Sequence, residues 1–325
     1  MRSDGLRPNG LLLPRVSLMP DNEPIYHHYV PQFYLRRWAN KERKVCRFSK
    51  PYDRILPKMT AISGTGGMDR LYEMKTVSPE FAQWFEKGPL KAIDTAANNV
   101  LELIEAGQID KLTSDQRSMW AGFLMSMLMR GPRDIAVIKA AYAQEWQAMI
   151  PEIVAEFEAN ENEVTRGLAT NVPAMLAPDS PLLADWGLEM AIGLMDHAGI
   201  GNILINMEWI VRDMPENAPE FLTSDRPIMK SGELVASDDF VMLPIGPRKL
   251  FIAVGDAETV RRVQAYDPAV QSLAVNRFIV ERAQECVYGT DDAQLEFVRE
   301  YMGTKPAKTL FERLVEFLER AGTPL

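Results

Sequence analysis

Cysteine, histidine and long apolar runs are scarce in this sequence of 325 residues, and each scarcity excludes a class of protein. Its two cysteines, Cys46 and Cys286, are too few and too far apart for a disulfide framework or a thiolate metal site. The longest apolar run, Met119–Met129, is about half the roughly 20 residues that a transmembrane helix needs. No signal-peptide pattern opens the chain. We therefore expect a cytoplasmic protein with no membrane association and a buried helix at Met119–Met129.

Basic residues are concentrated near the N-terminus although the net charge is −9. Residues 1–75 contain 14 Lys or Arg and 7 Asp or Glu, whereas the rest of the chain contains 22 and 38. Two interpretations stay open: the basic stretch attracts phosphate groups, or it pairs with the acidic remainder of the same protein. Nine basic residues lie between positions 36 and 58: Arg36, Arg37, Lys41, Arg43, Lys44, Arg47, Lys50, Arg54 and Lys58.

The hydrophobic content of 46% is ordinary for a globular protein, and the pattern changes along the chain. Residues 1–24 are rich in proline and show no helical or strand period, so we expect a disordered tail there. Met19 also offers a natural start, so residues 1–18 could come from an early start codon. We expect residues 25–325 to form a single interleaved α+β domain, predominantly helical with a small antiparallel sheet. Its helical middle spans 78–200, and its strand-bearing segments span 44–76 and 203–254.

Capping signals and periodicity place the expected elements. Thr113 opens a capping box before a helix to Arg130, and Asp267 caps another before Pro268. The expected helices cover 29–40, 78–86, 89–106, 114–130, 133–159, 182–198, 257–264, 268–284, 293–302 and 309–321. The expected strands cover 44–48, 203–212, 220–223, 240–243 and 249–254. We expect 203–212 and 220–223 to form an antiparallel hairpin. Residues 165–180 are expected to form a loop.

Two of the three histidines, His27 and His28, lie beside Tyr34 and Arg36 in the densest chemical signal of the chain. Imidazole is the side chain best suited to proton transfer near neutral pH. The alternative is that the rings pack against aromatic residues and bind a backbone carbonyl. The cluster therefore contains either a catalytic base or a set of packing residues.

The run from His27 to Ala39 (HHYVPQFYLRRWA) resembles the opening motif of a bacterial family known as domain of unknown function 4238. Later motifs follow in the family's order: Leu71-Tyr72-Glu73, Met129-Arg130-Gly131-Pro132, Phe221 to Pro227 (FLTSDRP), Leu243 to Pro247, Asn276, and Val287-Tyr288-Gly289. The likeness covers about residues 26–290. It implies a shared architecture and candidate residues, and no particular reaction. One departure is Arg226, where a small or polar residue such as Asn is expected.

The resemblance directs attention to five residues outside the histidine cluster. Asp225, after an expected strand, could orient an imidazole or bind a cation, or else form an Asx-turn before Pro227, with Ser224 beside it. Glu73 could be a general base or metal ligand and Arg130 an anion clamp, or the two could pair with each other. Asn276 lies on a helix, where Asn is a poor former, so we expect a hydrogen-bonding role.

Three functions fit these residues. The first is a phosphodiester-directed, nuclease-like hydrolase in which His28 is the general acid or base, Tyr34 and Asp225 orient it, and Glu73 is a second carboxylate or metal ligand. Arg36 and Arg130 would then stabilise phosphate charge, His27, Ser224 and Asn276 would contact substrate, and the cofactor would be unknown or a divalent metal. The second is a non-catalytic module that binds nucleic acid or a nucleotide. The third is a structural or interaction protein in which the motif residues determine the fold.

Overall fold

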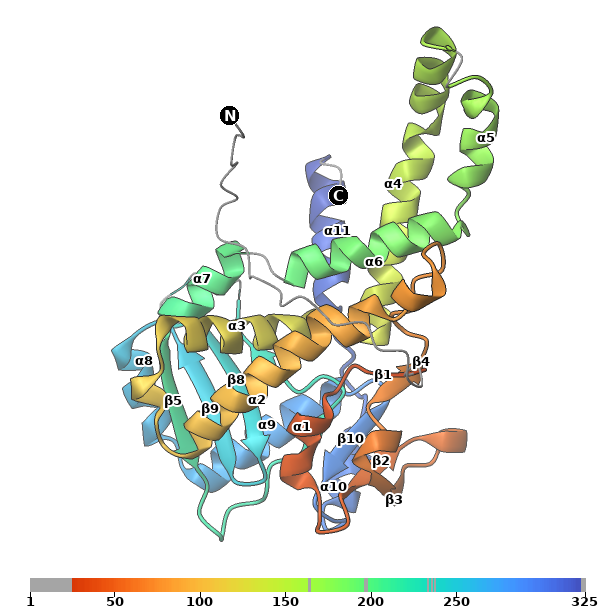
Figure 1. Ribbon diagram of the computed structural model, residues 1–325. Helices are drawn as coiled ribbons and strands as arrows, with labels where there is room; N and C mark the ends of the chain where they lie inside the picture. Colours follow the sequence, from red (N-terminus) through yellow and green to blue (C-terminus); the bar gives the residue numbers. More distant parts are fainter. Residues whose placement is uncertain are drawn as a thin grey trace.

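The computed structural model describes residues 25–162, 165–195, 198–232, 234, 236 and 238–322. The predicted tail, residues 1–24, lies outside the described residues. Helices predominate, and all the strand pairs in the described part are antiparallel, in three small sheets (Figure 1). The predicted α+β class with small antiparallel sheets is therefore confirmed.

The largest layered unit is a four-stranded sheet in the order β5-β9-β8-β7, covered by helices on both faces (Figure 1). Alternation along β9 directs Phe251 toward Trp120 of α3, and Leu250 and Ile252 toward the cluster formed with α8 and α9. The sheet is thus buried on both sides. Its strands are β5 (Glu208–Asp213), β7 (Met229–Lys230), β8 (Phe240–Gly246) and β9 (Lys249–Val254).

The second sheet joins segments from the two ends of the chain, in the order β3-β2-β10-β6. Its strands are β2 (Lys44–Ser49), β3 (Leu56–Ala61), β6 (Thr223–Ser224) and β10 (Cys286–Gly289). The short turn η2 (Pro51–Asp53) joins β2 to β3, so these two strands form a hairpin with β3 at the edge of the sheet. The indole N–H of Trp38 also donates to the carbonyl of Phe221, at 2.7 Å, and ties the N-terminal segment to the approach of β6.

The third sheet pairs β1 (Tyr26–His28) with β4 (Gly67–Asp69). His28 lies opposite Gly67, and a Cβ at Gly67 would lie 2.5 Å from the ring of Tyr26. Glycine is required at this position because the Tyr26 ring fills the space. Between β3 and β4 the chain forms the turn η3 (Ile62–Gly64).

Helices α4 and α5 project from the body of the molecule, and α6 crosses their base (Figure 1). The capping box of Thr113 and Gln116 and the cap of Asp267 are both confirmed. The helical segments are α1 (Gln32–Leu35), η1 (Arg36–Trp38), η4 (Pro79–Phe81), the π-turn η5 (Glu86–Leu90), α2 (Lys91–Glu105), η6 (Ile109–Lys111), α3 (Ser114–Met129), α4 (Pro132–Ala159), α5 (Leu168–Met175), α6 (Pro181–Met195), α7 (Ala198–Asn206), α8 (Ala257–Ala265), α9 (Pro268–Arg282), α10 (Leu295–Tyr301) and α11 (Leu310–Ala321).

Four local predictions are wrong. The expected strand 203–212 is helical up to Asn206, because a short apolar run fits a helix as well as a strand. The expected hairpin of 203–212 with 220–223 does not form: β5 pairs with β9, and β6 pairs with β10 in another sheet. The expected loop 165–180 contains α5, and the expected helix 29–40 is reduced to α1 and η1.

The stretch Pro181–Asn206 is long and apolar enough to cross a membrane by length and composition, and 27% of its most apolar window is buried. A core helix of a soluble protein meets the same criterion. Two residues inside this stretch, 196 and 197, lie outside the described part.

Candidate functional site

The two histidines of β1 have different surroundings. His27 is completely buried, and its Nε2 lies 2.5 Å from Oε1 of Gln83. Its Nδ1 accepts the backbone N–H of Tyr72 at 2.9 Å, and the two rings stack with centroids 5.6 Å apart. Both ring nitrogens are therefore used by the fold, which argues against the predicted substrate contact.

His28 is only partly exposed, and the edge of its ring meets the Tyr26 ring at a centroid distance of 5.1 Å. Its Nε2 is buried, and no hydrogen-bond partner for it exists among the described residues. Burial lowers the pKa of His28, an effect that the backbone oxygens of Ser63 and Ile62 oppose and the charge of Arg130 reinforces. The imidazole is therefore held in its neutral form near pH 7.

Glu86 contacts the same residue from the π-turn η5. Its Oε1 accepts the backbone N–H of His28 at 3.4 Å, while its Oε2 is buried and has no partner in the described part of the chain. Burial raises the pKa of Glu86 to about 7, although the His28 N–H and Arg130 oppose the shift. Sequence reasoning missed Glu86. The available signal was Gly88-Pro89 at the junction of the expected helices 78–86 and 89–106, where the structure has a π-turn, and π-turns often occur at functional sites.

Arg130 is completely buried behind this pair. Its Nε donates to the carbonyl of Tyr29 at 3.0 Å, and its Nη1 donates to Asp94 Oδ1 at 2.8 Å. Its own carbonyl accepts the hydroxyl of Tyr72. Burial raises the pKa of Asp94, and Arg130 opposes that shift. The predicted pairing of Arg130 with Glu73 is wrong, because Asp94, which the sequence did not single out, takes that place.

Glu73 and Arg36 lie elsewhere. Glu73 pairs with Arg70, and its Oε1 accepts Nε2 of Gln83 at 3.1 Å. Through Gln83 it supports the position of His27. Arg36 is exposed on η1.

Tyr34 and Asn276 join segments of the core. The hydroxyl of Tyr34 lies 2.7 Å from Thr223 Oγ1 and donates to the carbonyl of Pro244 at 2.8 Å. Asn276 accepts the backbone N–H of Leu222 at 2.9 Å and donates to the carbonyl of Glu220 at 2.8 Å. The expected hydrogen-bonding role of Asn276 is confirmed. Both side chains are fully buried, which argues against the predicted catalytic and substrate-binding roles.

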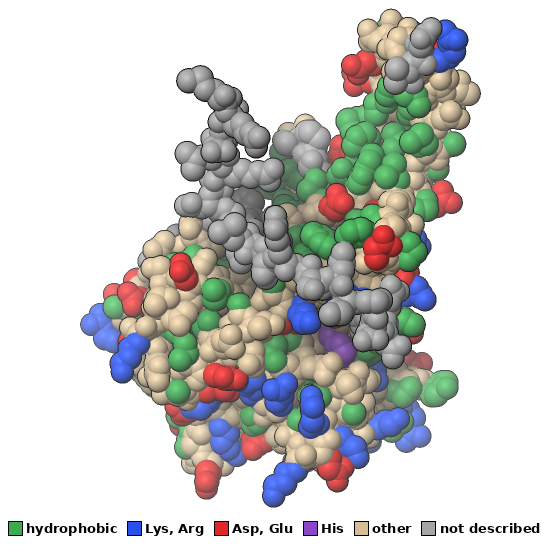
Figure 2. Space-filling view, viewed as in Figure 1, with side chains coloured by type: hydrophobic (Ala, Val, Ile, Leu, Met, Phe, Trp, Pro, Cys, Tyr) green, Lys and Arg blue, Asp and Glu red, His purple; other side chains and the backbone are tan. Residues whose placement is uncertain are grey.

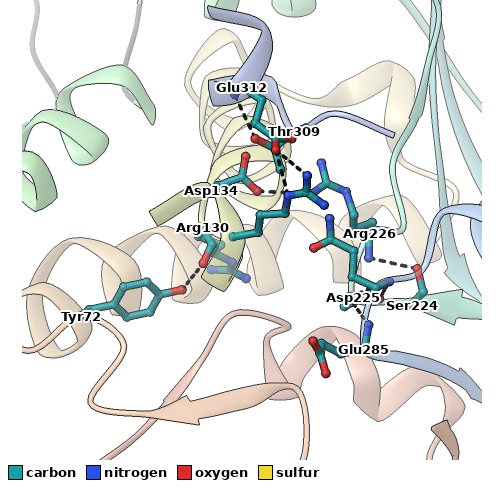
Figure 3. A network of polar contacts seen from close by, with 11 residues as sticks. Tyr72, Arg130, Asp134, Ser224, Asp225, Arg226, Glu285, Thr309 and Glu312 are labelled. Carbon is teal, nitrogen blue, oxygen red and sulfur yellow. Dashed lines mark hydrogen bonds and ion pairs between the residues drawn. The ribbon is translucent and has the colours of Figure 1, made fainter. Parts of the chain in front are cut away.

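The carboxylate of Asp225 binds the backbone ahead of β10 (Figure 3). It accepts the N–H groups of Gln284 at 3.1 Å and Glu285 at 2.9 Å. Burial raises its pKa to about 6 in spite of these bonds. The local turn depends on Ser224, whose Oγ accepts the Arg226 N–H at 3.0 Å, so the proposed Asx-turn is wrong.

Arg226 reaches away from Asp225 toward α4 and α11 (Figure 3). Its Nη1 lies 3.4 Å from Asp134 Oδ2, beside the capping box formed by Thr309 and Glu312. The arginine at this position therefore connects the β6 turn to two helices.

The predicted residues thus do not form one cluster. The carboxylate of Asp225 binds the backbone ahead of β10. His28 adjoins Glu86 and Arg130. No hydrogen bond joins the His28 ring to Asp225 or Tyr34 within the described residues, so the predicted orientation of His28 by these two side chains is not observed. Nor does any set of three His, Cys, Asp or Glu side chains suited to a metal ion occur in the described part.

The raised pKa of Glu86 predicts a pH-dependent stability. The folded state binds this proton more tightly than the unfolded state, where the pKa is near 4.5. The stabilisation is therefore complete below pH 4.5 and is lost as the pH rises through about 7. Glu86→Gln, which imitates the protonated acid, should match the wild type at low pH and exceed its unfolding free energy by about 3 kcal/mol at pH 8.

Urea unfolding of both proteins between pH 4.5 and 8 measures this difference. Glu152→Gln, at an exposed carboxylate of α4, is the matched control and should follow the wild type at every pH. Parallel curves for the wild type and Glu86→Gln would show that the carboxyl group titrates as it does in water.

Comparison with known proteins places the chain in a family and supplies no activity. Residues 26–293 match the family model described as Protein of unknown function (DUF4238). Neither a curated protein nor a solved structure matches the chain.

Proposed function

Because the chain belongs to the DUF4238 family of proteins of unknown function, we propose its function from the site alone: a phosphodiester-directed hydrolase in which His28 and Glu86 are the base and the acid. One observation carries this proposal. His28 Nε2 and Glu86 Oε2 are both buried and lack hydrogen-bond partners among the described residues, on two residues that are themselves in contact. A buried polar atom without a partner costs about 1–3 kcal/mol, so a fold that retains two of them here has another use for them.

The environments of these groups assign their roles. Burial lowers the pKa of His28 and raises that of Glu86 to about 7, so near neutrality the imidazole is unprotonated and much of the carboxyl is protonated. His28 takes a proton from the attacking water as its oxygen bonds to phosphorus. Glu86 gives its proton to the leaving alkoxide as the P–O bond breaks. The proton bound by His28 then returns to Glu86 through solvent, which restores both groups.

The basic hairpin supports a phosphate-bearing substrate. The backbone N–H of Ile62, in the turn whose carbonyls face His28, donates to the carbonyl of Arg43 at 3.1 Å. The site thus adjoins one end of the β2–β3 hairpin. Lys and Arg side chains are numerous where α1 and this hairpin form the surface (Figure 2). Arg43 therefore replaces Arg130 as the residue that we propose to contact phosphate, since Arg130 is engaged by Asp94.

The remaining motif residues position this site. Arg130 fixes the backbone of Tyr29, next to His28, and His27 anchors β1 to Tyr72. The pairing of β10 with β2 supports a single interleaved domain for residues 25–325. The two free, buried cysteines fit the proposed cytoplasmic location.

The test is hydrolysis of bis(p-nitrophenyl) phosphate by the full chain, without metal and with Mg²⁺ or Mn²⁺. The profile of kcat/KM against pH should be bell-shaped. Its acid limb should lie below the ordinary His pKa of 6.5 and its alkaline limb near pH 7, where Glu86 loses its proton. In Glu86→Gln the rate should fall and the alkaline limb should disappear. Equal activity in Glu86→Gln and wild type would refute the proposal.

A second candidate is a non-catalytic module that binds nucleic acid. The exposed basic side chains of the hairpin favour it, because they need no catalytic group to bind phosphate. Absence of hydrolysis under all three metal conditions, together with salt-dependent binding, would favour this candidate over the hydrolase.

A further inference from the structure

The β2–β3 hairpin is a basic projection of the second sheet, and β3 is its outer strand. Its two acidic side chains are already paired, Glu42 with Lys44 and Asp53 with Lys50. Four exposed cations make no ion pair within the described residues: Lys41, Arg43, Arg54 and Lys58. Arg47, which is half-buried, donates to Cys286 Sγ instead. Positive charge on this hairpin therefore exceeds what its own carboxylates neutralise.

An aromatic ring stands at the tip of the same hairpin. Tyr52 is 97% exposed, although burying a tyrosine ring would be favourable. Its backbone is left-handed, with φ 54° and ψ 40°, and that of Asp53 is left-handed as well, with φ 63°. Such a conformation costs a non-glycine residue on the order of 1 kcal/mol. The turn thus accepts strain while it presents the ring to solvent.

Strand β3 connects this tip to the site. At about 3.3 Å per residue its six residues, Leu56–Ala61, span roughly 20 Å, and η3, against which His28 lies, follows directly. Lys58, near the middle of β3, is paired in register with Arg47. An extended chain along β3 would therefore pass an aromatic ring, then cations, and arrive at His28.

We propose that the hairpin binds single-stranded nucleic acid, with Tyr52 stacked on a base and Arg54, Lys58 and Arg43 on successive phosphates. This inference rests on the proposed function, because it names the substrate class of the same site. A single strand exposes the faces of its bases, whereas a duplex buries them, so an isolated surface tyrosine selects the single strand. Stacking tolerates any base, and the phosphate contacts carry no sequence information, so binding is independent of sequence.

The experiment is fluorescence anisotropy of the full chain in EDTA with a labelled 20-nucleotide poly(dT) strand whose linkages are phosphorothioates, which keep the backbone charge and resist hydrolysis. Tyr52→Ala should weaken binding about 10- to 100-fold, and Tyr52→Trp should restore it. Arg54→Ala and Lys58→Ala should each reduce the slope of log affinity against log salt by about 0.7. A labelled duplex of the same length should bind more weakly than the single strand.

Tyr52→Gly separates recognition from folding. Glycine removes the ring and also relieves the left-handed strain, so stability should hold or rise while binding falls. Tyr266→Ala, at a tyrosine that directly follows α8 and is 58% exposed, is the matched control and should bind normally. Equal affinity of the wild type and Tyr52→Ala, or equal affinity for duplex and single strand, would overturn the proposal.

The proposed hydrolase activity and the proposed binding of single-stranded nucleic acid can be refuted independently of each other. Binding of poly(dT) without hydrolysis of any phosphodiester would remove the catalytic function and leave the hairpin as a binding site. Hydrolysis of bis(p-nitrophenyl) phosphate without binding of the oligonucleotide would leave the catalytic function and overturn this inference.

Discussion

His28→Gln should lower kcat for phosphodiester hydrolysis about 10²- to 10⁴-fold, the usual contribution of a positioned general base. Glutamine replaces the imidazole with an amide of similar size, and this amide cannot accept a proton near neutral pH. Because the His28 Nε2 makes no hydrogen bond within the described residues, whereas both ring nitrogens of His27 are engaged, His28→Gln should cost less unfolding free energy than His27→Gln. Steady-state kinetics and urea unfolding of the same preparation measure both effects.

The neighbouring histidine is a matched control with the opposite expectation. His27→Gln loses the bond from Tyr72 and the stacked ring, so it should destabilise the fold by about 1–3 kcal/mol. Below its unfolding temperature it should retain most of the wild-type kcat. If His28→Gln keeps full activity, or if it loses stability as His27→Gln does, then His28 is a packing residue and the proposed base is wrong.

Arg130→Met should destabilise the protein by about 3–5 kcal/mol. Methionine fills much of the volume of the arginine stem. However, it leaves the carboxylate of Asp94 without its cation and the carbonyl of Tyr29 without its donor. Chemical unfolding at pH 7 measures this loss of stability. The kcat of the folded protein for phosphodiester hydrolysis should fall less than in His28→Gln.

Two further variants test whether the unpaired charge of Asp94 causes the loss of stability in Arg130→Met. The double variant of Arg130→Met and Asp94→Leu should recover a large part of the stability, because it removes the charge left unpaired. Arg133→Met breaks the ion pair between Arg133 and Glu312. Because the Arg133 side chain is 48% exposed, the unfolding free energy should fall by less than about 1 kcal/mol. If Arg130→Met loses no more stability than Arg133→Met, then the ion pair of Arg130 with Asp94 does not stabilise the fold as we expect.

Sequence reasoning succeeded where the signal is local. The capping box at Thr113 and the cap at Asp267 were predictable because each depends on residues that are three or fewer positions apart. Strands β8 and β9 were predictable because their short apolar runs are separated by turn residues. The pairing of β6 with β10 was not, since nothing in a two-residue strand indicates a partner more than 60 positions away.

The candidate site was predictable only in part for the same reason. His28 was found because histidine is rare and its neighbours are aromatic and basic. Glu86 was missed because its role depends on a π-turn and on a contact with a residue 58 positions earlier. Asp94 is likewise an ordinary polar position of an amphipathic helix until Arg130 is placed beside it. The family motifs marked positions of structural importance, and they did not distinguish an orienting residue from a reacting one.

The position of β10 between β2 and β6 affects how the chain must fold during synthesis. The N-terminal hairpin is made first, yet its inner edge has no neighbour until Cys286–Gly289 has left the ribosome. Contacts of such long sequence separation form slowly, so the nascent chain carries an open strand edge through most of its translation. Chains that end before β10 should therefore be prone to aggregation, and the growing protein should depend on chaperones until its last strand arrives.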